Sequence, residues 1–128
     1  MTTTRSPGGD RRRPELREVG LTLPGRVKAA LLEAAAAAGR SAGEWVLVAA
    51  ADHGAALQEA LGQVELRRRP RVDDATFAAV ALTAEERDEL DERAVSCGLN
   101  RSVFVTSVSR LALGEELDVV VAPLAEPR

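Results

Sequence analysis

The sequence predicts a mainly α domain, because a short strand followed by two helices occurs in it twice. Residues 19–24 lead into a helical run, a Gly-Arg-Ser turn and a second helical run, and residues 78–83 begin the same series. The two turns start 59 residues apart, at Gly39 and Gly98, and the strands keep this offset. One strand with two helices cannot bury its own apolar faces, so two copies indicate a single domain built by pairing them.

Composition favours the same class. Hydrophobic residues make up 45% of the 128 residues, but aromatic residues only 2%. The core must therefore consist of Ala, Leu and Val, which suits close-packed helices. A chain of this length is enough for one domain with a modest core.

The first copy begins with an alternating segment at residues 18–23. Val19, Leu21 and Leu23 fall on one side of it, which predicts a half-buried strand. Pro24 ends this strand and suits the first turn of a helix. That helix carries one apolar stripe at spacings of three and four, made of Val27, Leu31, Ala34 and Ala38.

A glycine turn separates the two helices of the first copy. Gly39 fits the left-handed position that closes a helix. Ser41 and Glu44 then form a capping box, so a second helix follows, and we expect it to bury mainly its first two turns. Residues 58–75, which contain Pro70 and four arginines, are interpreted as the linker to the second copy.

The second copy keeps this order with different side chains. Its strand turns Ala78, Val80 and Leu82 inward, and Thr83 and Glu86 form a second capping box. The next helix continues the buried stripe with Leu90, Ala94 and Cys97. The last helix is capped by Asn100 and closed by Gly114, and its core face comprises Phe104, Val105, Val108, Leu111 and Ala112.

Charge is distributed in blocks, although the net charge is only −3. Seven basic residues lie between Met1 and Lys28, a second cluster lies between the copies, and acidic residues concentrate at 85–92 and 115–118. Basic blocks of this kind are either solubilising arms or phosphate contacts.

We interpret residues 1–15 as a flexible basic arm and residues 16–114 as the domain, with copies at 17–57 and 76–114. Residues 115–128 are interpreted as an acidic and apolar tail, in which residues 117–121 have β character.

The sequence holds no motif for catalysis, for a metal or for a cofactor. His53 has no paired ligand or nearby nucleophile, and the acidic residues at 85–92 are spaced as a solvated face. We therefore predict a protein that is not an enzyme and uses no cofactor. Cys97 is the only cysteine, which fits a reducing compartment. No run approaches the roughly 18 apolar residues of a membrane span, so we expect no membrane contact and a cytoplasmic location.

Two short motifs recur at matching spacing. The first copy contains Leu21-Thr22-Leu23-Pro24 and Gly39-Arg40-Ser41, and the second contains Val80-Ala81-Leu82-Thr83 and Gly98-Leu99-Asn100-Arg101-Ser102. These motifs resemble the ribbon-helix-helix family of Arc-, MetJ- and CopG-like repressors, and their presence in one chain resembles its tandem, TraY-like members. The resemblance implies a tandem ribbon-helix-helix fold: one antiparallel ribbon of two strands plus four helices, in a single-chain pseudo-dimer. Such pairing also covers one edge of each strand, whereas an isolated strand would leave both edges open.

The resemblance implies double-stranded DNA as the partner, with the ribbon in the major groove. The outward strand residues would then meet base edges: Glu18, Gly20, Thr22, Phe77, Ala79 and Ala81. None of these is Arg, Lys, Asn or Gln, the side chains that usually read bases, so direct readout would be thin. Thr22 can hydrogen-bond a base, Glu18 can accept from a cytosine amino group, and Phe77 or Ala81 can touch a thymine methyl.

Phosphate contacts are assigned to two helix starts and to the arginine clusters. Backbone amides at a helix N-terminus bind anions. The residues at the two helix starts are Arg40, Ser41, Ala42, Asn100, Arg101 and Ser102. The residues in the clusters are Arg11, Arg12, Arg13, Arg67, Arg68, Arg69 and Arg71. Ser41 and Asn100 would cap their helices with or without a ligand, so these two residues do little to distinguish a phosphate site from an ordinary helix cap.

Two functions are compatible with the sequence. The first is a DNA-binding transcriptional regulator, such as a repressor, whose pseudo-dimers would be monomeric in solution and could self-associate on DNA. The alternative is a protein-interaction module, such as an antitoxin or an adaptor, with a degenerate DNA face. In that alternative, residues 115–128 are the partner segment, which would fold on binding or add a strand to the partner's sheet.

Overall fold

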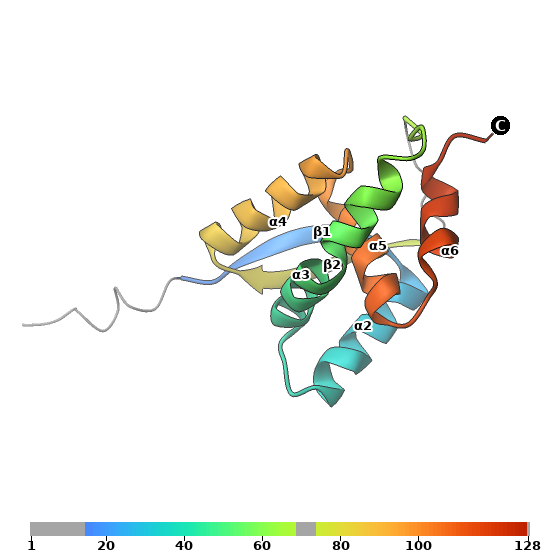
Figure 1. The fold of residues 1–128 in the computed structure, drawn as a ribbon. Coiled ribbons are helices and arrows are strands. Elements are labelled where there is room, and N and C mark those ends of the chain that lie inside the picture. Colours follow the sequence, from blue (N-terminus) through green and yellow to red (C-terminus); the bar gives the residue numbers. More distant parts are fainter. Residues whose placement is uncertain (1–14, 69–73, 128) are drawn as a thin grey trace, which may run out of the picture.

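The computed structural model of the protein describes residues 15–68 and 74–127 (Figure 1). Two strands form its sheet, β1 (Arg17–Pro24) and β2 (Ala75–Leu82). The helices are α2 (Gly25–Ala37), α3 (Ala42–Leu61), α4 (Ala84–Ser96), α5 (Arg101–Ala112) and α6 (Leu117–Val121), and the 3₁₀ helix η1 (Ala122–Leu124) follows α6. None of the helices in the described ranges is long and apolar enough to cross a membrane.

The predicted fold class, two strands with four helices, is wrong, because the described residues contain a fifth α-helix. This helix, α6, occupies the segment interpreted as a tail with β character. Val120, Val121 and Leu124 are buried, and α6 packs against α3 and α5. A run of β-branched residues favours a strand locally, but burial of one side of a short helix decides the conformation here. Residues 117–124 are therefore part of the domain and its core.

β1 and β2 pair antiparallel, with Gly20 opposite Ala79 at the middle of the register. Successive side chains of a strand point to opposite faces. The inner face is buried and consists of Val19, Leu21, Leu23, Ala78, Val80 and Leu82. The outer face is exposed along both strands. The sheet therefore contributes one face to the core and leaves the other to solvent.

The core lies between the inner face of the sheet and two packed helices, α3 and α5. Its fully buried side chains include Phe104, Val46, Leu57 and Val108. The strand of each copy is covered by the last helix of the other copy, since α5 packs on β1 and α3 packs on β2. Helices α2 and α4 lie on opposite sides of this pair, and α6 lies at the end away from the start of β1 (Figure 1).

Three of the predicted helical faces need correction. Helix α3 buries side chains along its whole length, down to Leu57 and Leu61, rather than only in its first two turns. It also extends to Leu61, so the linker starts later than the predicted residue 58. Helix α2 buries Ala35 in place of the predicted Ala34 and Ala38. In α5, the predicted core residues Leu111 and Ala112 are half-buried and exposed, respectively.

The predicted side-chain caps and glycine stops are confirmed, but Pro24 is the last residue of β1 and the N-cap of α2 rather than a residue of its first turn. Ser41 and Glu44 form a capping box at α3, and Thr83 and Glu86 form one at α4. Asn100 caps α5, where its Oδ1 accepts a hydrogen bond from Val103 N at 2.9 Å. The three glycines predicted to close helices, Gly39, Gly98 and Gly114, have φ values of 69°, 76° and 101°. Glycine adopts this left-handed region without a steric penalty, which explains its use at these three stops.

Candidate nucleic-acid interface

The six residues predicted to contact bases share the outer face of the sheet. All of them are exposed. They form three cross-strand pairs: Glu18 with Ala81, Gly20 with Ala79, and Thr22 with Phe77. Phe77 is 69% exposed, although it is the largest apolar side chain of the face. The outer face is thus narrow, mostly built of small residues, and carries one aromatic ring and one carboxylate.

Hydrogen bonds at the strand edges fix the geometry of this face. Thr22 N donates to Ser102 Oγ at 2.9 Å, and Phe77 O accepts from Lys28 Nζ at 2.9 Å. These groups point away from the partner strand, so Thr22 and Phe77 form a non-hydrogen-bonded pair, in which opposing side chains approach most closely. A Cβ atom on Gly20 would lie 3.2 Å from Phe77 Cε1. The aromatic ring therefore reaches over Gly20 toward the middle of the face.

The first turn of α5 lies along the edge of β1, but its arginine is already paired. Arg101 Nε and one terminal nitrogen each donate to a carboxylate oxygen of Asp91 at 2.7 Å. This bidentate pair holds the pKa of Asp91 below its usual value and raises the pKa of Arg101. Ser102 is occupied as the acceptor for Thr22 N. The predicted phosphate contact of Arg101 stays a prediction, and in this structure Asp91 offsets the charge that the contact would use.

The first turn of α3 lies at the equivalent place on the edge of β2. Gly43 packs so closely on Ala81 O that a Cβ atom would collide with it. Glu44 Oε1 accepts from Ser41 N at 2.9 Å, and Glu44 N donates to Ser41 Oγ at 3.1 Å. The hydrogen bond from Ser41 N is the main reason why the pKa of Glu44 is below its usual value. This helix start holds its own carboxylate, which weakens it as a phosphate site, although Arg40 beside it is exposed.

The arginine clusters are only partly described. Arg67 is bound to the C-terminal segment: its N donates to Leu124 O at 2.9 Å and its Nε to Ala125 O at 3.0 Å. Arg67 thus has a structural contact that the sequence did not suggest, whereas Arg68 is exposed. The other predicted cluster residues lie outside the described residues: Arg11, Arg12, Arg13, Arg69 and Arg71.

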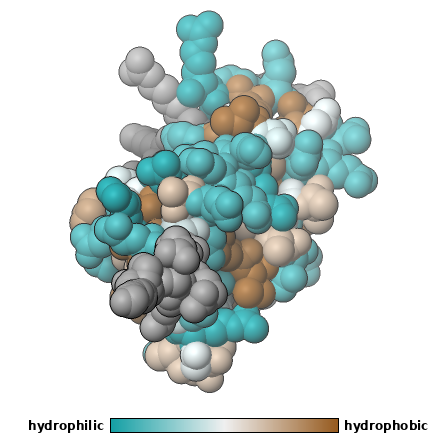
Figure 2. All heavy atoms as spheres, turned by 90° about the vertical axis from the view of Figure 1, so that its left-hand side faces the viewer, coloured by the Kyte–Doolittle hydropathy of each residue, from teal (hydrophilic) through white to brown (hydrophobic). Residues whose placement is uncertain are grey.

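The described residues carry an excess of negative charge. Seven of the 17 Lys and Arg and two of the 20 Asp and Glu lie outside them, which leaves ten basic and eighteen acidic side chains, a balance of −8. Hydrophilic side chains cover most of the side where β1 and α4 begin, and hydrophobic ones form small separate patches there (Figure 2). Any strong attraction to phosphates would therefore depend on arginines of residues 1–14 and 69–73.

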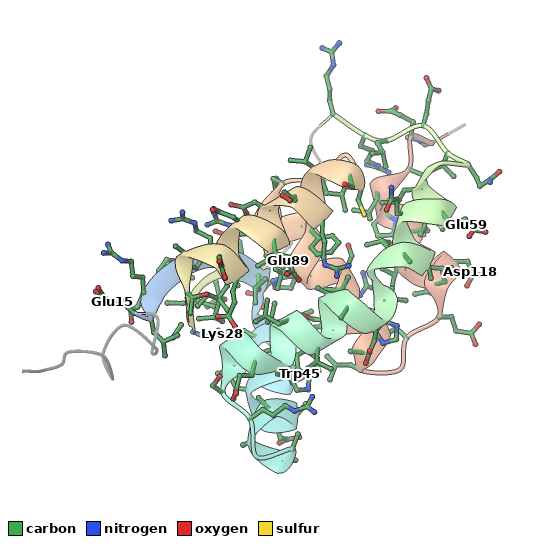
Figure 3. The ribbon with its side chains drawn as sticks, turned by 60° about the vertical axis from the view of Figure 1, so that its left-hand side comes forward. Glu15, Lys28, Trp45, Glu59, Glu89 and Asp118 are labelled. Atoms are coloured by element: carbon green, nitrogen blue, oxygen red, sulfur yellow. The ribbon has the colours of Figure 1, made fainter. Side chains whose placement is uncertain are left out.

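A polar groove between α3 and α4 was missed by sequence reasoning. It has a volume of about 350 Å³, and Glu89 lies in it between the two helices (Figure 3). Its other lining residues are Gly54, Ala55, Gln58, Glu92, Arg93 and Ser96. Arg93 Nε lies 3.7 Å from Glu89 Oε2, so the groove contains its own ion pair. Gly54 in the middle of α3 was the only available sequence signal, because glycine allows close approach of a neighbouring helix.

The described residues offer little reactive chemistry. Cys97 is buried, and burial raises the pKa of its thiol, so it is a protonated core side chain at neutral pH. No group of three or more His, Cys, Asp or Glu in the described ranges is arranged to hold a metal ion.

No protein-family model, curated protein or solved structure matches this chain. The likeness of its two motifs to ribbon-helix-helix proteins therefore stays a prediction. The function is therefore inferred from the geometry of the outer face and of its edges.

Proposed function

We propose that this protein binds double-stranded DNA and acts as a transcriptional regulator in the cytoplasm. The observation that carries the proposal is the exposed outer face of the sheet, which has the first turn of a helix along each edge. The major groove of B-DNA admits a two-stranded β-ribbon. Helix N-termini on both sides of such a ribbon favour the phosphates that flank the groove.

In this proposal the outer face supplies the base contacts. Thr22 offers a hydroxyl, Glu18 can accept from a cytosine amino group, and Phe77 offers an apolar surface to a thymine methyl. The face has no Arg, Lys, Asn or Gln among its six outward residues. Sequence-dependent DNA shape would therefore contribute to selectivity.

Phosphate affinity would come mainly from the arginine-rich segments. Residues 1–14 contain four arginines immediately ahead of β1, and residues 69–73 contain two. Because the described residues have a balance of −8, these cations are needed to offset repulsion between the domain and DNA. Arg40 and Arg68 are exposed cations that can add to them.

The direct test is fluorescence anisotropy with a labelled random-sequence duplex over a range of salt concentrations. We expect binding at low salt that weakens as salt rises, because each phosphate contact releases counterions and adds about 0.9 to the logarithmic slope. Removal of residues 1–14 should flatten the slope. Arg40→Ala should weaken binding, whereas Arg93→Ala, the matched loss of one charge in the groove between α3 and α4, should not. Absence of binding at low salt would rule the proposal out.

A second candidate function is supported by the apolar exposure of the same face. Phe77 is 69% exposed, and Leu16, just before β1, is 60% exposed. Exposed aromatic and aliphatic side chains are also typical of protein contact sites. Val120, Val121 and Leu124 are buried, so these side chains are not available to a partner. In this alternative, the partner-binding surface is therefore the outer face of the sheet rather than residues 115–128. If DNA binding is absent, the wild type and Phe77→Ala should be compared for capture of protein partners, and loss of capture with Phe77→Ala would support the alternative.

A further inference from the structure

The register of the sheet relates each outward residue to a definite equivalent in the other copy. The copies are offset by 59 residues, and Gly20 pairs directly with its own equivalent, Ala79. The pairing is therefore symmetric about this central pair. Glu18 and Phe77 are equivalent positions at opposite ends of the face, and so are Thr22 and Ala81.

Equivalent positions of the face carry different chemistry. At one end, the hydroxyl of Thr22 lies opposite the aromatic ring of Phe77. At the other end, the carboxylate of Glu18 lies opposite the methyl group of Ala81. The ring also reaches over Gly20, where a Cβ atom would approach Phe77 Cε1 to 3.2 Å. One end of the face is thus apolar with a hydroxyl, and the other is small and acidic.

The contacts made at the strand edges also differ between the two ends of the face. Lys28 Nζ donates to Phe77 O at 2.9 Å, which places a cation beside the aromatic end. Its equivalent, Arg87, instead contacts Asp88 at 3.2 Å. Ser102 accepts a hydrogen bond from Thr22 N, whereas its equivalent, Gly43, packs on the backbone of β2. Charge and anchoring therefore add to the difference between the two ends.

We propose that the two ends of this face read different bases, so that the protein recognises a non-palindromic DNA sequence in one orientation. The inference rests on the proposed DNA binding. The Thr22–Phe77 end fits a base pair that presents a thymine methyl, which packs on the ring, and an acceptor for the hydroxyl. The Glu18–Ala81 end fits a cytosine, whose amino group donates to the carboxylate.

The test is selection of bound duplexes from a random pool, with the wild-type protein and with a variant whose face is symmetric. Glu18→Ala, Gly20→Ala, Phe77→Ala and Ala81→Thr together place Ala at positions 18 and 77, Ala at the central positions 20 and 79, and Thr at positions 22 and 81. All four positions are exposed, so the variant should fold, which its circular dichroism melting curve checks. The wild type should enrich a motif that differs from its reverse complement. The symmetric variant should enrich a palindromic motif.

A second measurement isolates the aromatic end. Replacing thymine by deoxyuridine in the selected duplex removes only the C5 methyl group. Loss of one buried methyl contact should weaken wild-type binding about fourfold at one thymine position. Phe77→Ala should bind both duplexes equally, because the ring that contacts the methyl group is absent.

The outcomes separate this inference from the proposed function. A palindromic wild-type motif would overturn the inference and leave DNA binding standing. An unchanged non-palindromic motif with the symmetric variant would also overturn it, because the polarity would then arise outside these residues. Failure of the wild type to enrich any sequence, together with no binding at low salt, would overturn both proposals.

Discussion

The two strand-helix-helix copies differ more at their edges than in their core. In the core, Trp45 of α3 and Phe104 of α5 are 59 residues apart and both are buried aromatic side chains. At the edges, Asp91 and Arg101 form an ion pair between α4 and α5, whereas the equivalent residues of the first copy are Leu32 and Ala42.

This difference shows which positions the fold constrains. Several buried equivalents, such as Val46 and Val105, keep the same volume, because the two copies jointly fill one closely packed core. The edges and the outer face of the sheet have diverged, since packing does not fix the side chains there. Those are also the places where the proposed DNA contacts lie. Substitutions at three pairs of equivalent residues, and at the Asp91–Arg101 ion pair that the first copy lacks, should therefore have effects on stability of different size.

Phe104→Ala should have the largest effect on stability. Phe104 is 0% exposed, and truncation of a buried aromatic side chain lowers the free energy of unfolding by about 3–5 kcal/mol. Trp45→Ala should cost less, because Trp45 is 9% exposed and lies at the margin of the core. Urea unfolding of both variants measures the difference. An equal or larger loss for Trp45→Ala would show that the copies do not share the core as described.

Gly43→Ala should be the next most destabilising change. A Cβ atom at this position collides with Ala81 O, and overpacking of this kind lowers stability by about 1–3 kcal/mol. The equivalent variant, Ser102→Ala, removes the acceptor of Thr22 N and should lower stability by about 1 kcal/mol. Thermal unfolding compares the two. A neutral Gly43→Ala would contradict the close approach of α3 to β2.

Ser109→Ala should stabilise the protein. Ser109 is 0% exposed, and its Oγ has no hydrogen-bond partner among the described residues. Its equivalent in α3 is Ala50, which is also buried. Removing a buried, unsatisfied hydroxyl should raise the free energy of unfolding by about 1 kcal/mol, as measured in urea. A loss of stability would show that the hydroxyl makes an interaction in solution.

Asp91→Asn should have the smallest effect and should change the pH dependence of stability. The pKa of Asp91 is lowered in the folded protein by the hydrogen bonds from Arg101. The unfolded chain therefore takes up a proton first as the pH falls. The stabilisation is present above the ordinary carboxyl pKa of about 4 and is lost as the pH drops through the folded value.

The expected magnitude is below about 1 kcal/mol at neutral pH, because both side chains of the pair are about one-third exposed and solvent screens them. Urea unfolding at pH 7 and near pH 3 tests this. The difference in stability between wild type and Asp91→Asn should shrink in acid. A difference that is constant with pH would show that the ion pair does not contribute through its charge.

Much of the fold could be predicted from local sequence patterns. Alternation located both strands, and the capping boxes at Ser41 and Thr83 located the starts of α3 and α4. Helix α6 could not be predicted, because β-branched residues at 117–121 favour a strand unless a core is present to bury Val120 and Val121. Sequence alone cannot supply that tertiary context.

The positions of the outward residues could be predicted, but the contacts that the nearby arginines make could not. Strand alternation identified the six outward residues, all of which are exposed. The pairing of Arg101 with Asp91 was hidden, because the two residues are ten positions apart across a turn between helices. The contact of Arg67 with Ala125 joins segments 58 residues apart, and no local pattern signals it.

The central claim is that the outer face of the sheet binds DNA, and amide chemical-shift mapping by NMR tests it most directly. A short duplex would be titrated into isotope-labelled protein at low salt. The largest shifts should fall on Gly20, Thr22, Phe77 and Ala79 and on the first turns of α3 and α5. Shifts confined to α4 or α6, with the sheet amides unchanged, would contradict the claim.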